Sequence, residues 1–174
     1  MLKNYNRYKV LKIFLNSPTE TFRLRELSRL SGISPLSVAN YLKELEEEGI
    51  LTRFEKNRVP FYKAMRDNEK FRLYQKISTI YELEESGLID EIWYALSPDA
   101  IILYGSFSKG DAIETSDVDL FIIGKEKKID LSKYENKLGR EIHLMFKQDI
   151  KKVPNELRNN LINGIVLKGY LKVF

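Results

Sequence analysis

Two stretches decide the fold: Gly105-Ser106-Phe107-Ser108-Lys109-Gly110 and, shortly after it, Ser116-Asp117-Val118-Asp119-Leu120. The apolar run 100–104 comes directly before the first stretch, and the apolar run 120–123 begins at the end of the second. Short apolar runs of this kind are typical of buried strands. The sequence therefore predicts a strand, a loop bounded by glycines, a short connection and a second strand.

Two aspartates lie at the start of the second strand. Side chains two residues apart on a strand share a face, so Asp117 and Asp119 point the same way while Val118 and Leu120 point into the core. Two adjacent carboxylates repel each other unless a cation lies between them. Because a hard divalent ion takes carboxylate and phosphate oxygens, the pair predicts a site for Mg²⁺ or Mn²⁺.

The loop after the first strand offers groups to a phosphate. Gly105 leaves room for a phosphate to approach the backbone, and Ser106 offers it a hydroxyl and an N–H. Lys109 and Lys125 carry charge that can neutralise a triphosphate, although surface lysines are common and a solvated side chain is the alternative for each. The spacing thus predicts a phosphate cradle facing a metal-binding pair.

This arrangement resembles the nucleotidyltransferase family that includes DNA polymerase beta, kanamycin nucleotidyltransferase and the minimal prokaryotic nucleotidyltransferases. The family pattern is glycine-serine, a following glycine, and serine-aspartate-x-aspartate, and its elements here are Gly105, Ser106, Gly110, Ser116, Asp117 and Asp119. The resemblance implies a small mixed sheet with helices over residues 88–174. It also implies metal-assisted transfer of a nucleoside monophosphate from an NTP, with ATP the expected donor, to a hydroxyl acceptor.

The resemblance assigns roles to individual residues. Asp117 and Asp119 are the expected catalytic metal ligands. The expected nucleotide-binding residues are Gly105, Ser106, Lys109 and Ser116.

The third carboxylate of the family, a metal ligand and general base, belongs on a later strand. The matching strand is 140–146, and the turn before it aligns His143 with the expected aspartate. Glu141 lies two residues earlier on the same face, and a histidine can accept a proton near neutral pH. Glu141 and His143 are therefore both candidate catalytic residues; the alternative is that both are structural and the domain is inactive.

The N-terminal part shows three helical patterns and a hairpin. Apolar spacing predicts helices over 5–16, 24–30 and 35–48, with Leu24, Leu27 and Leu30 on one face of the second. Strand-like residues follow over 50–63. This order resembles a winged helix-turn-helix DNA-binding domain.

In such a domain the third helix enters the major groove and the wing lies against phosphates. The residues predicted to contact double-stranded DNA are Ser34, Ser37, Asn40, Tyr41 and Lys43 on the helix, and Arg53, Lys56 and Arg58 on the wing. Four glutamates over 44–48 oppose binding because they repel phosphates. The alternative is a helical module for dimerisation or for docking the second domain.

Charge supports two modules. Residues 1–66 hold 13 Lys/Arg against 7 Asp/Glu, whereas 67–174 hold 16 against 18. A helix without glycine or proline is predicted over 67–86, and it can pair with its copy in a homodimer or pack on the next domain. We expect an α+β protein with a winged helix-turn-helix over 1–66, a connecting helix over 67–87 and a mixed-sheet domain over 88–174.

Composition excludes several classes of site. The chain has no cysteine and a single histidine, so disulfides, thiolate sites and multi-histidine zinc sites are out. The sequence contains no run of about 18 apolar residues that could span a membrane. Basic residues also interrupt the apolar residues near the N-terminus, so we expect a cytoplasmic protein.

Three functions fit these patterns. The first is a nucleotidyltransferase carrying a DNA-binding domain. The second is a transcriptional regulator whose transferase-like domain binds nucleotide or a partner. The third is an antitoxin-like protein that modifies a small helical toxin, as minimal nucleotidyltransferases do.

Overall fold

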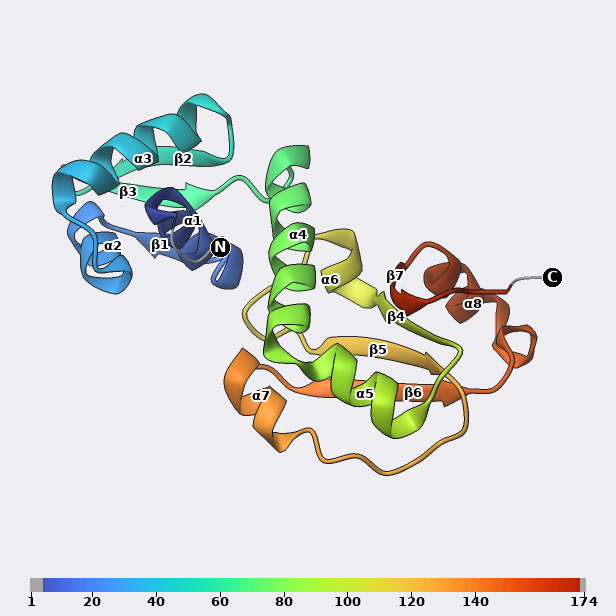
Figure 1. The fold of residues 1–174 in the computed structure, drawn as a ribbon. Coiled ribbons are helices and arrows are strands. Elements are labelled where there is room, and N and C mark those ends of the chain that lie inside the picture. Colours follow the sequence, from blue (N-terminus) through green and yellow to red (C-terminus); the bar gives the residue numbers. More distant parts are fainter. Residues whose placement is uncertain (1–4, 173–174) are drawn as a thin grey trace. The chain divides into compact units, whose positions relative to one another are not determined.

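The computed structural model describes residues 5–172 as an α+β protein (Figure 1). The chain forms two compact units, residues 1–75 and 76–174. Helix α4 (Glu69–Ser86) begins in the first unit and ends in the second.

The first unit is a winged three-helix domain. Its elements are α1 (Asn6–Asn16), β1 (Thr21–Phe22), α2 (Leu24–Ser31), α3 (Pro35–Glu47), β2 (Leu51–Lys56) and β3 (Val59–Ala64). The three strands pair antiparallel in the order β1-β3-β2.

The turn between α2 and α3 forms where the sequence predicts it. Gly32 ends α2 with φ 68°, a conformation that suits glycine. The Ser34 hydroxyl accepts a hydrogen bond from the Ser37 N–H at 3.3 Å, and Pro35 opens α3. These contacts fix the direction in which α3 leaves the turn.

The core of this unit contains Val38, Leu42 and Leu45 of α3, whose spacing places them on one face of the helix. Of the three leucines predicted to share one face of α2, Leu27 is fully buried, whereas Leu30 is 54% exposed. Leu30 lies in the last turn of this short helix, next to the exposed Gly32, where the chain turns away.

The turn at the tip of the wing is shorter than the polar run of residues 55–58 suggests. Lys56 pairs with Val59 as the last residue of β2, so only Asn57 and Arg58 form the turn. Both have positive φ, 54° and 61°, as a two-residue type I′ turn requires. Arg58 is therefore held at the apex, with Lys56 one step behind it.

The second unit contains a four-stranded mixed sheet. Besides the end of α4, its elements are α5 (Leu88–Leu96), β4 (Ala100–Tyr104), α6 (Gly105–Lys109), β5 (Val118–Ile123), α7 (Ser132–Leu138), β6 (Ile142–Lys147), the 3₁₀ turn η2 (Ile150–Lys152), α8 (Asn155–Ile162) and β7 (Ile165–Gly169). The strand order is β6-β5-β4-β7, with β5 and β6 parallel and the other pairs antiparallel.

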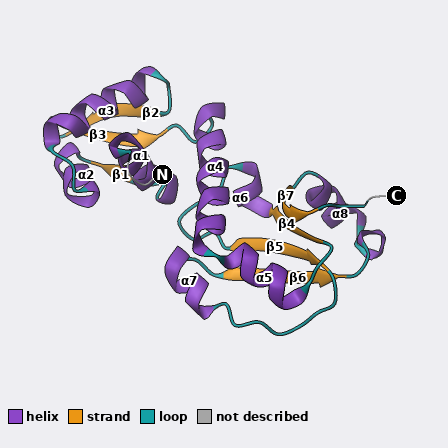
Figure 2. Cartoon of the chain, in the orientation of Figure 1, coloured by secondary structure: helices purple, strands orange, loops and turns teal. Residues whose placement is uncertain are grey.

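Both faces of this sheet are covered (Figure 2). Even-numbered residues of β5, such as Leu120, pack with α5 and with Tyr134 of α7. Odd-numbered residues of β5, such as Phe121, pack with η2 and with Leu161 of α8. Val118 and Leu120 thus enter the core as predicted, and Asp119 lies on the same face of β5 as Phe121.

The predicted strands 100–104 and 120–123 are present as β4 and within β5. Helix α8 stops at Ile162, and residues 165–169 form strand β7. A Cβ on Gly164 would lie 2.7 Å from the Leu103 carbonyl oxygen, so glycine lets the chain pass close to β4. Helix α7 was not anticipated.

We expect Gly164→Ala to destabilise the second unit by about 2–4 kcal/mol, since backbone must shift to admit the methyl group. Gly139→Ala is the control, because its Cβ meets nothing within 4 Å although φ is 65°. That change should cost only about 1 kcal/mol. Urea unfolding measures both, and equal losses would contradict the close approach of 164 to β4.

Candidate active site

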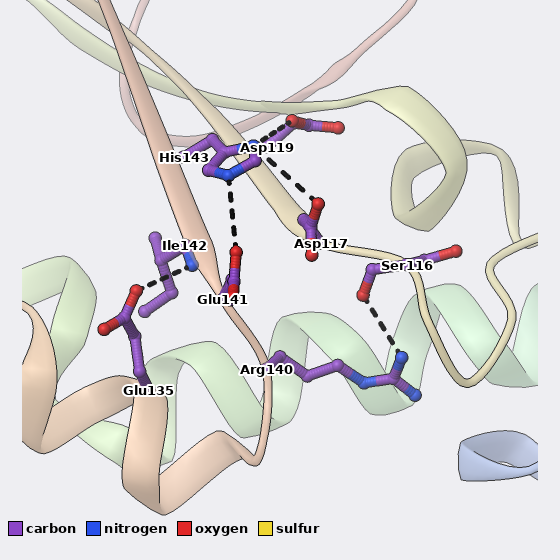
Figure 3. A network of polar contacts seen from close by, with 8 residues as sticks. All are labelled: Ser116, Asp117, Asp119, Glu135, Arg140, Glu141, Ile142 and His143. Carbon is purple, nitrogen blue, oxygen red and sulfur yellow. Dashed lines mark hydrogen bonds and ion pairs between the residues drawn. The ribbon is translucent and has the colours of Figure 1, made fainter.

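The parallel pairing of β5 and β6 assembles the site (Figure 3). In this register Asp119 lies beside His143. The Val118 N–H donates to the Glu141 carbonyl at 2.9 Å, which extends the pairing to the start of β5. Residues 24 positions apart in the chain, such as Asp119 and His143, therefore meet at one end of the sheet, on the later strand to which the family resemblance assigned Glu141 and His143.

The His143 ring lies among three carboxylates (Figure 3). Its Nδ1 is 3.7 Å from Asp119 Oδ1 and 3.9 Å from Asp117 Oδ2, and its Nε2 is 3.9 Å from Glu141 Oε2. These separations exceed hydrogen-bond length. The side chain of Glu141 is 78% exposed, and that of Asp119 only 31%. The site is thus an acidic group open to solvent on the Glu141 side.

The surroundings of Asp119 shift the pKa of its carboxyl group. Burial raises the pKa of its carboxyl group, and the charge of Asp117 raises it further while His143 lowers it. Tyr104 pairs with Asp119 across the strands, and burial, followed by the charge of Asp119, raises the pKa of this phenol as well. A cation bound here would relieve the excess negative charge.

Gly105 connects the predicted phosphate cradle to the acidic pair. Its φ is 72°, and a Cβ at this position would lie 2.5 Å from Asp119 Oδ2. A residue with a side chain would therefore be strained and would displace the carboxylate. The glycine serves two purposes at once, because it forms the turn into α6 and leaves space for Asp119.

The other predicted nucleotide-binding residues lie on α6 and in the loop before β5. Ser106 is half-buried in the first turn of α6, where helical N–H groups have no partner within the helix. Lys109 is exposed at the end of α6. The Ser116 hydroxyl oxygen accepts from the Ile113 N–H at 2.9 Å, so this side chain also closes the loop.

Arg140 braces the same loop and was not singled out from the sequence. Its guanidinium donates to the carbonyls of Ile113, Glu114 and Ser116, at 2.6, 2.6 and 3.1 Å, and lies 5.3 Å from the Phe107 ring centroid. Burial lowers its pKa from the ordinary value. Arg140 thus ties α6 to the residues just before Asp117. The turn before β6 was the one sequence signal that pointed to it.

Glu135 of α7 was also missed. Its carboxylate accepts from the Ile142 N–H at 3.1 Å (Figure 3). The bond ties the start of β6 to α7 at Ile142, the residue between Glu141 and His143.

Three of these side chains form a group suited to a divalent cation. Ligand atoms of Asp117, Glu141 and His143 lie within 4.8 Å of one another. Carboxylates suit Mg²⁺ and Mn²⁺, whereas imidazole suits transition metals better than Mg²⁺. The residues therefore fit a divalent ion.

The predicted DNA-binding residues lie on one helix and its wing. Ser34, Asn40 and Lys43 are exposed, whereas Ser37 and Tyr41 are half-buried, Tyr41 against the core. On the wing, Arg53, Lys56 and Arg58 are all exposed.

The glutamates at the end of α3 are partly neutralised. Arg7 of α1 forms ion pairs with Glu44, at 3.2 Å, and with Glu48. Lys43 approaches Glu47 at 3.8 Å. Their repulsion of phosphates is thereby weaker than the sequence alone suggests.

The family comparison agrees with this geometry, because residues 86–167 match the model of the nucleotidyltransferase domain. The second unit carries a nucleotidyltransferase domain. Residues 3–52 match the model of winged helix-turn-helix DNA-binding domains. Both domains occur in the order that the sequence predicts, and the site described above lies within the nucleotidyltransferase domain.

One solved structure similar to this chain is described as a possible transcriptional regulator from Methanosarcina mazei Go1. The two are 26% identical, with a TM-score of 0.37, over 52% of this chain and 81% of the other. No curated protein matches the chain. None of the helices over residues 5–172 is long and apolar enough to cross a membrane.

The raised pKa of Asp119 predicts a pH-dependent stability. A folded-state pKa above the unfolded value means that the carboxylate destabilises the native domain at neutral pH, and that the penalty vanishes below the unfolded pKa. Asp119→Asn should therefore raise the melting temperature of the nucleotidyltransferase domain at pH 7, by about 1–4 °C. The difference should disappear as the pH falls toward 4.

Asp130→Asn is the matched control. Hydrogen bonds from Ser132 lower the pKa of Asp130, so this carboxylate stabilises the fold above its unfolded pKa. Its replacement should leave the melting temperature at pH 7 unchanged or slightly lower. Scanning calorimetry from pH 4 to pH 8 compares the two, and a melting temperature of Asp119→Asn below that of the parent at pH 7 would refute the destabilising role of Asp119.

Proposed function

We propose that the protein transfers a nucleoside monophosphate from an NTP, ATP being the expected donor, to a hydroxyl acceptor, and that its winged helix-turn-helix binds double-stranded DNA. The observation that carries the first half is the meeting of Asp117, Asp119 and His143, beside Gly105, at one end of a nucleotidyltransferase sheet.

The reaction replaces a phosphoanhydride bond at the α-phosphorus by a phosphoester bond. The acceptor oxygen forms a bond to the α-phosphorus as the bond from that phosphorus to the bridging oxygen breaks, and pyrophosphate leaves. The acceptor proton passes to a base. A bound Mg²⁺ or Mn²⁺ supplies charge neutralisation for the phosphates.

Each residue has a proposed task. Asp117, Asp119 and His143 hold the cation. Glu141, which lies within 4.8 Å of the ligand atoms of Asp117 and His143 and is more exposed than either aspartate, takes the acceptor proton beside that cation. The α6 turn, Lys109 and the Ser116 loop hold the triphosphate by N–H groups and charge.

Label transfer tests this assignment. The protein is incubated with α-labelled NTPs, Mn²⁺ or Mg²⁺ and extract. We expect transfer to be lost in Asp117→Ala and Asp119→Ala, and to fall about 10²–10³-fold in Glu141→Gln, as loss of a general base predicts. Lys128→Ala, at an exposed lysine outside the site, is the control. Failure of the parent protein to bind metal·NTP would exclude the enzyme.

His143 predicts a metal preference. A histidine among the ligands favours Mn²⁺ over Mg²⁺, whereas three carboxylates suit Mg²⁺. The parent protein should therefore bind NTP more tightly with Mn²⁺ than with Mg²⁺. His143→Asp should reverse this order, by changing the ratio of the two dissociation constants for NTP about tenfold. Calorimetric titration of NTP with each ion measures this. An unchanged preference in His143→Asp would place His143 outside the metal site.

Positions on the wing support the DNA proposal, because the exposed tip holds Lys56 and Arg58 away from the core. Lys56→Ala/Arg58→Ala should weaken binding to double-stranded DNA and reduce its salt dependence by about two counterions. Lys125→Ala/Lys128→Ala removes the same charge from an exposed loop of the other domain. Gel shifts at several salt concentrations measure the affinity of both variants for DNA. Equal losses of affinity in the two variants would show that the wing does not bind DNA.

A second candidate is a DNA-binding regulator, or an antitoxin-like protein, in which the nucleotidyltransferase domain binds nucleotide or a partner without efficient catalysis. The presence of His143 in the position expected for aspartate favours it. The homodimer expected from the connecting helix fits either function. Nucleotide binding without label transfer would identify the regulator.

A further inference from the structure

The nucleotidyltransferase domain has a second recess, at the opposite end of its sheet from the acidic site. Asp119 is near the first residue of β5, and Ile123, the last, lines a cavity of about 450 Å³. Asp99, at the start of β4, and Tyr170, just after β7, line it too. Because β4 pairs antiparallel with both β5 and β7, these residues lie at the same end of the sheet, about 13 Å along β5 from Asp119.

Backbone contacts build the floor of this cavity. The Asp99 N–H donates to the Ile123 carbonyl at 2.8 Å, and the Asp99 carbonyl accepts from the Tyr170 N–H at 3.3 Å. Gly169 has φ 77°, and a Cβ there would overlap the Asp99 carbonyl oxygen. These contacts fix Tyr170 at the rim.

The opposite wall is held by side chains. The Asp149 carboxylate accepts from the Lys151 N–H at 2.8 Å and caps η2. Arg158 of α8 donates to the carbonyls of Lys151 and Val153, at 2.8 and 2.9 Å. The segment that carries Lys151 into the lining is therefore fixed before any ligand arrives.

The lining combines aromatic rings with cations. Trp93 and Tyr170 offer flat faces, and Lys151 and Lys172 offer ammonium groups. The Lys172 ammonium lies 5.7 Å from the Tyr170 ring centroid, and that of Lys168 lies 5.5 Å from the Trp93 centroid. Aromatic faces stack on nucleobases, and lysines bind phosphate.

The carboxylates narrow the ligand class. Asp99 and Asp149 would repel an extended phosphodiester, but a carboxylate accepts hydrogen bonds from the amino and imino groups of a base or from ribose hydroxyls. A cavity of this size suits a small molecule. We propose that this recess binds a nucleoside phosphate, with the base between Trp93 and Tyr170 and the phosphate on Lys151 and Lys172, as a site separate from the catalytic one.

Trp93 is the one tryptophan in the sequence, so its fluorescence reports on this cavity directly. The experiment uses the full chain with Asp117→Asn and Asp119→Asn in the presence of EDTA. These conditions abolish metal-dependent binding of nucleotide at the catalytic end. ATP, GTP and CTP should still quench Trp93 in a saturable manner, and calorimetry should give one nucleotide per chain. Inorganic triphosphate should bind more weakly, because it lacks a base.

Adding Lys151→Ala and Lys172→Ala should raise the dissociation constant about tenfold or more. Lys128→Ala and Lys133→Ala, which remove the same charge from exposed positions outside the lining of the cavity, should leave it unchanged. Both lysines of the cavity are exposed, and circular dichroism confirms that the variants fold.

Three results would overturn the proposal. One is that millimolar nucleotide neither quenches Trp93 fluorescence nor gives a heat of binding. Another is that the two pairs of lysine substitutions change the dissociation constant equally. The third is a single-stranded oligonucleotide that binds more tightly than mononucleotides through the same lysines, which would assign the recess to nucleic acid. Label transfer by the parent protein is measured separately, so loss of this site and loss of the proposed enzyme activity are distinguishable.

Discussion

The parallel pairing of β5 with β6 is the constraint on which the site depends. Strand pairing sets which side chains stand opposite each other, and a shift by one residue would turn each side chain to the other face. In the observed register Asp119 faces His143. Glu135 and Arg140 secure the two ends of the connection, one by holding the start of β6 and the other by holding the loop before β5. The chemistry of the site is thus a consequence of sheet register.

Much of this arrangement is predictable from sequence. Apolar runs located β4 and β5 because buried strands leave an unbroken pattern, and the alternation at 117–120 gave the correct faces. The winged domain was equally readable, since Gly32, Ser34 and Pro35 each have a specific preference for the conformation they adopt.

Other features depend on long-range contacts that no local pattern records. In the sequence Arg140 cannot be distinguished from a surface arginine, because its hydrogen bonds to the loop before β5 exist only in the folded domain. Leu30 has the spacing of an apolar helical face, but the short helix α2 leaves it exposed. Strand β7 was hidden because 165–169 follows a helix directly, and its strand character comes from pairing with β4. The neutralisation of Glu44 and Glu48 by Arg7 is similarly non-local, with 41 positions between Arg7 and Glu48.

The space that Gly105 leaves for Asp119 has a consequence for how the site responds to its substrate. A carboxylate oxygen lies against the backbone of the turn that is expected to receive the triphosphate, with no side chain between them. Any displacement of that turn on binding is therefore transmitted to the acid by direct contact. The conformation of the Gly105 turn and the position of the Asp119 carboxylate are therefore coupled, so that a ligand that moves one also moves the other.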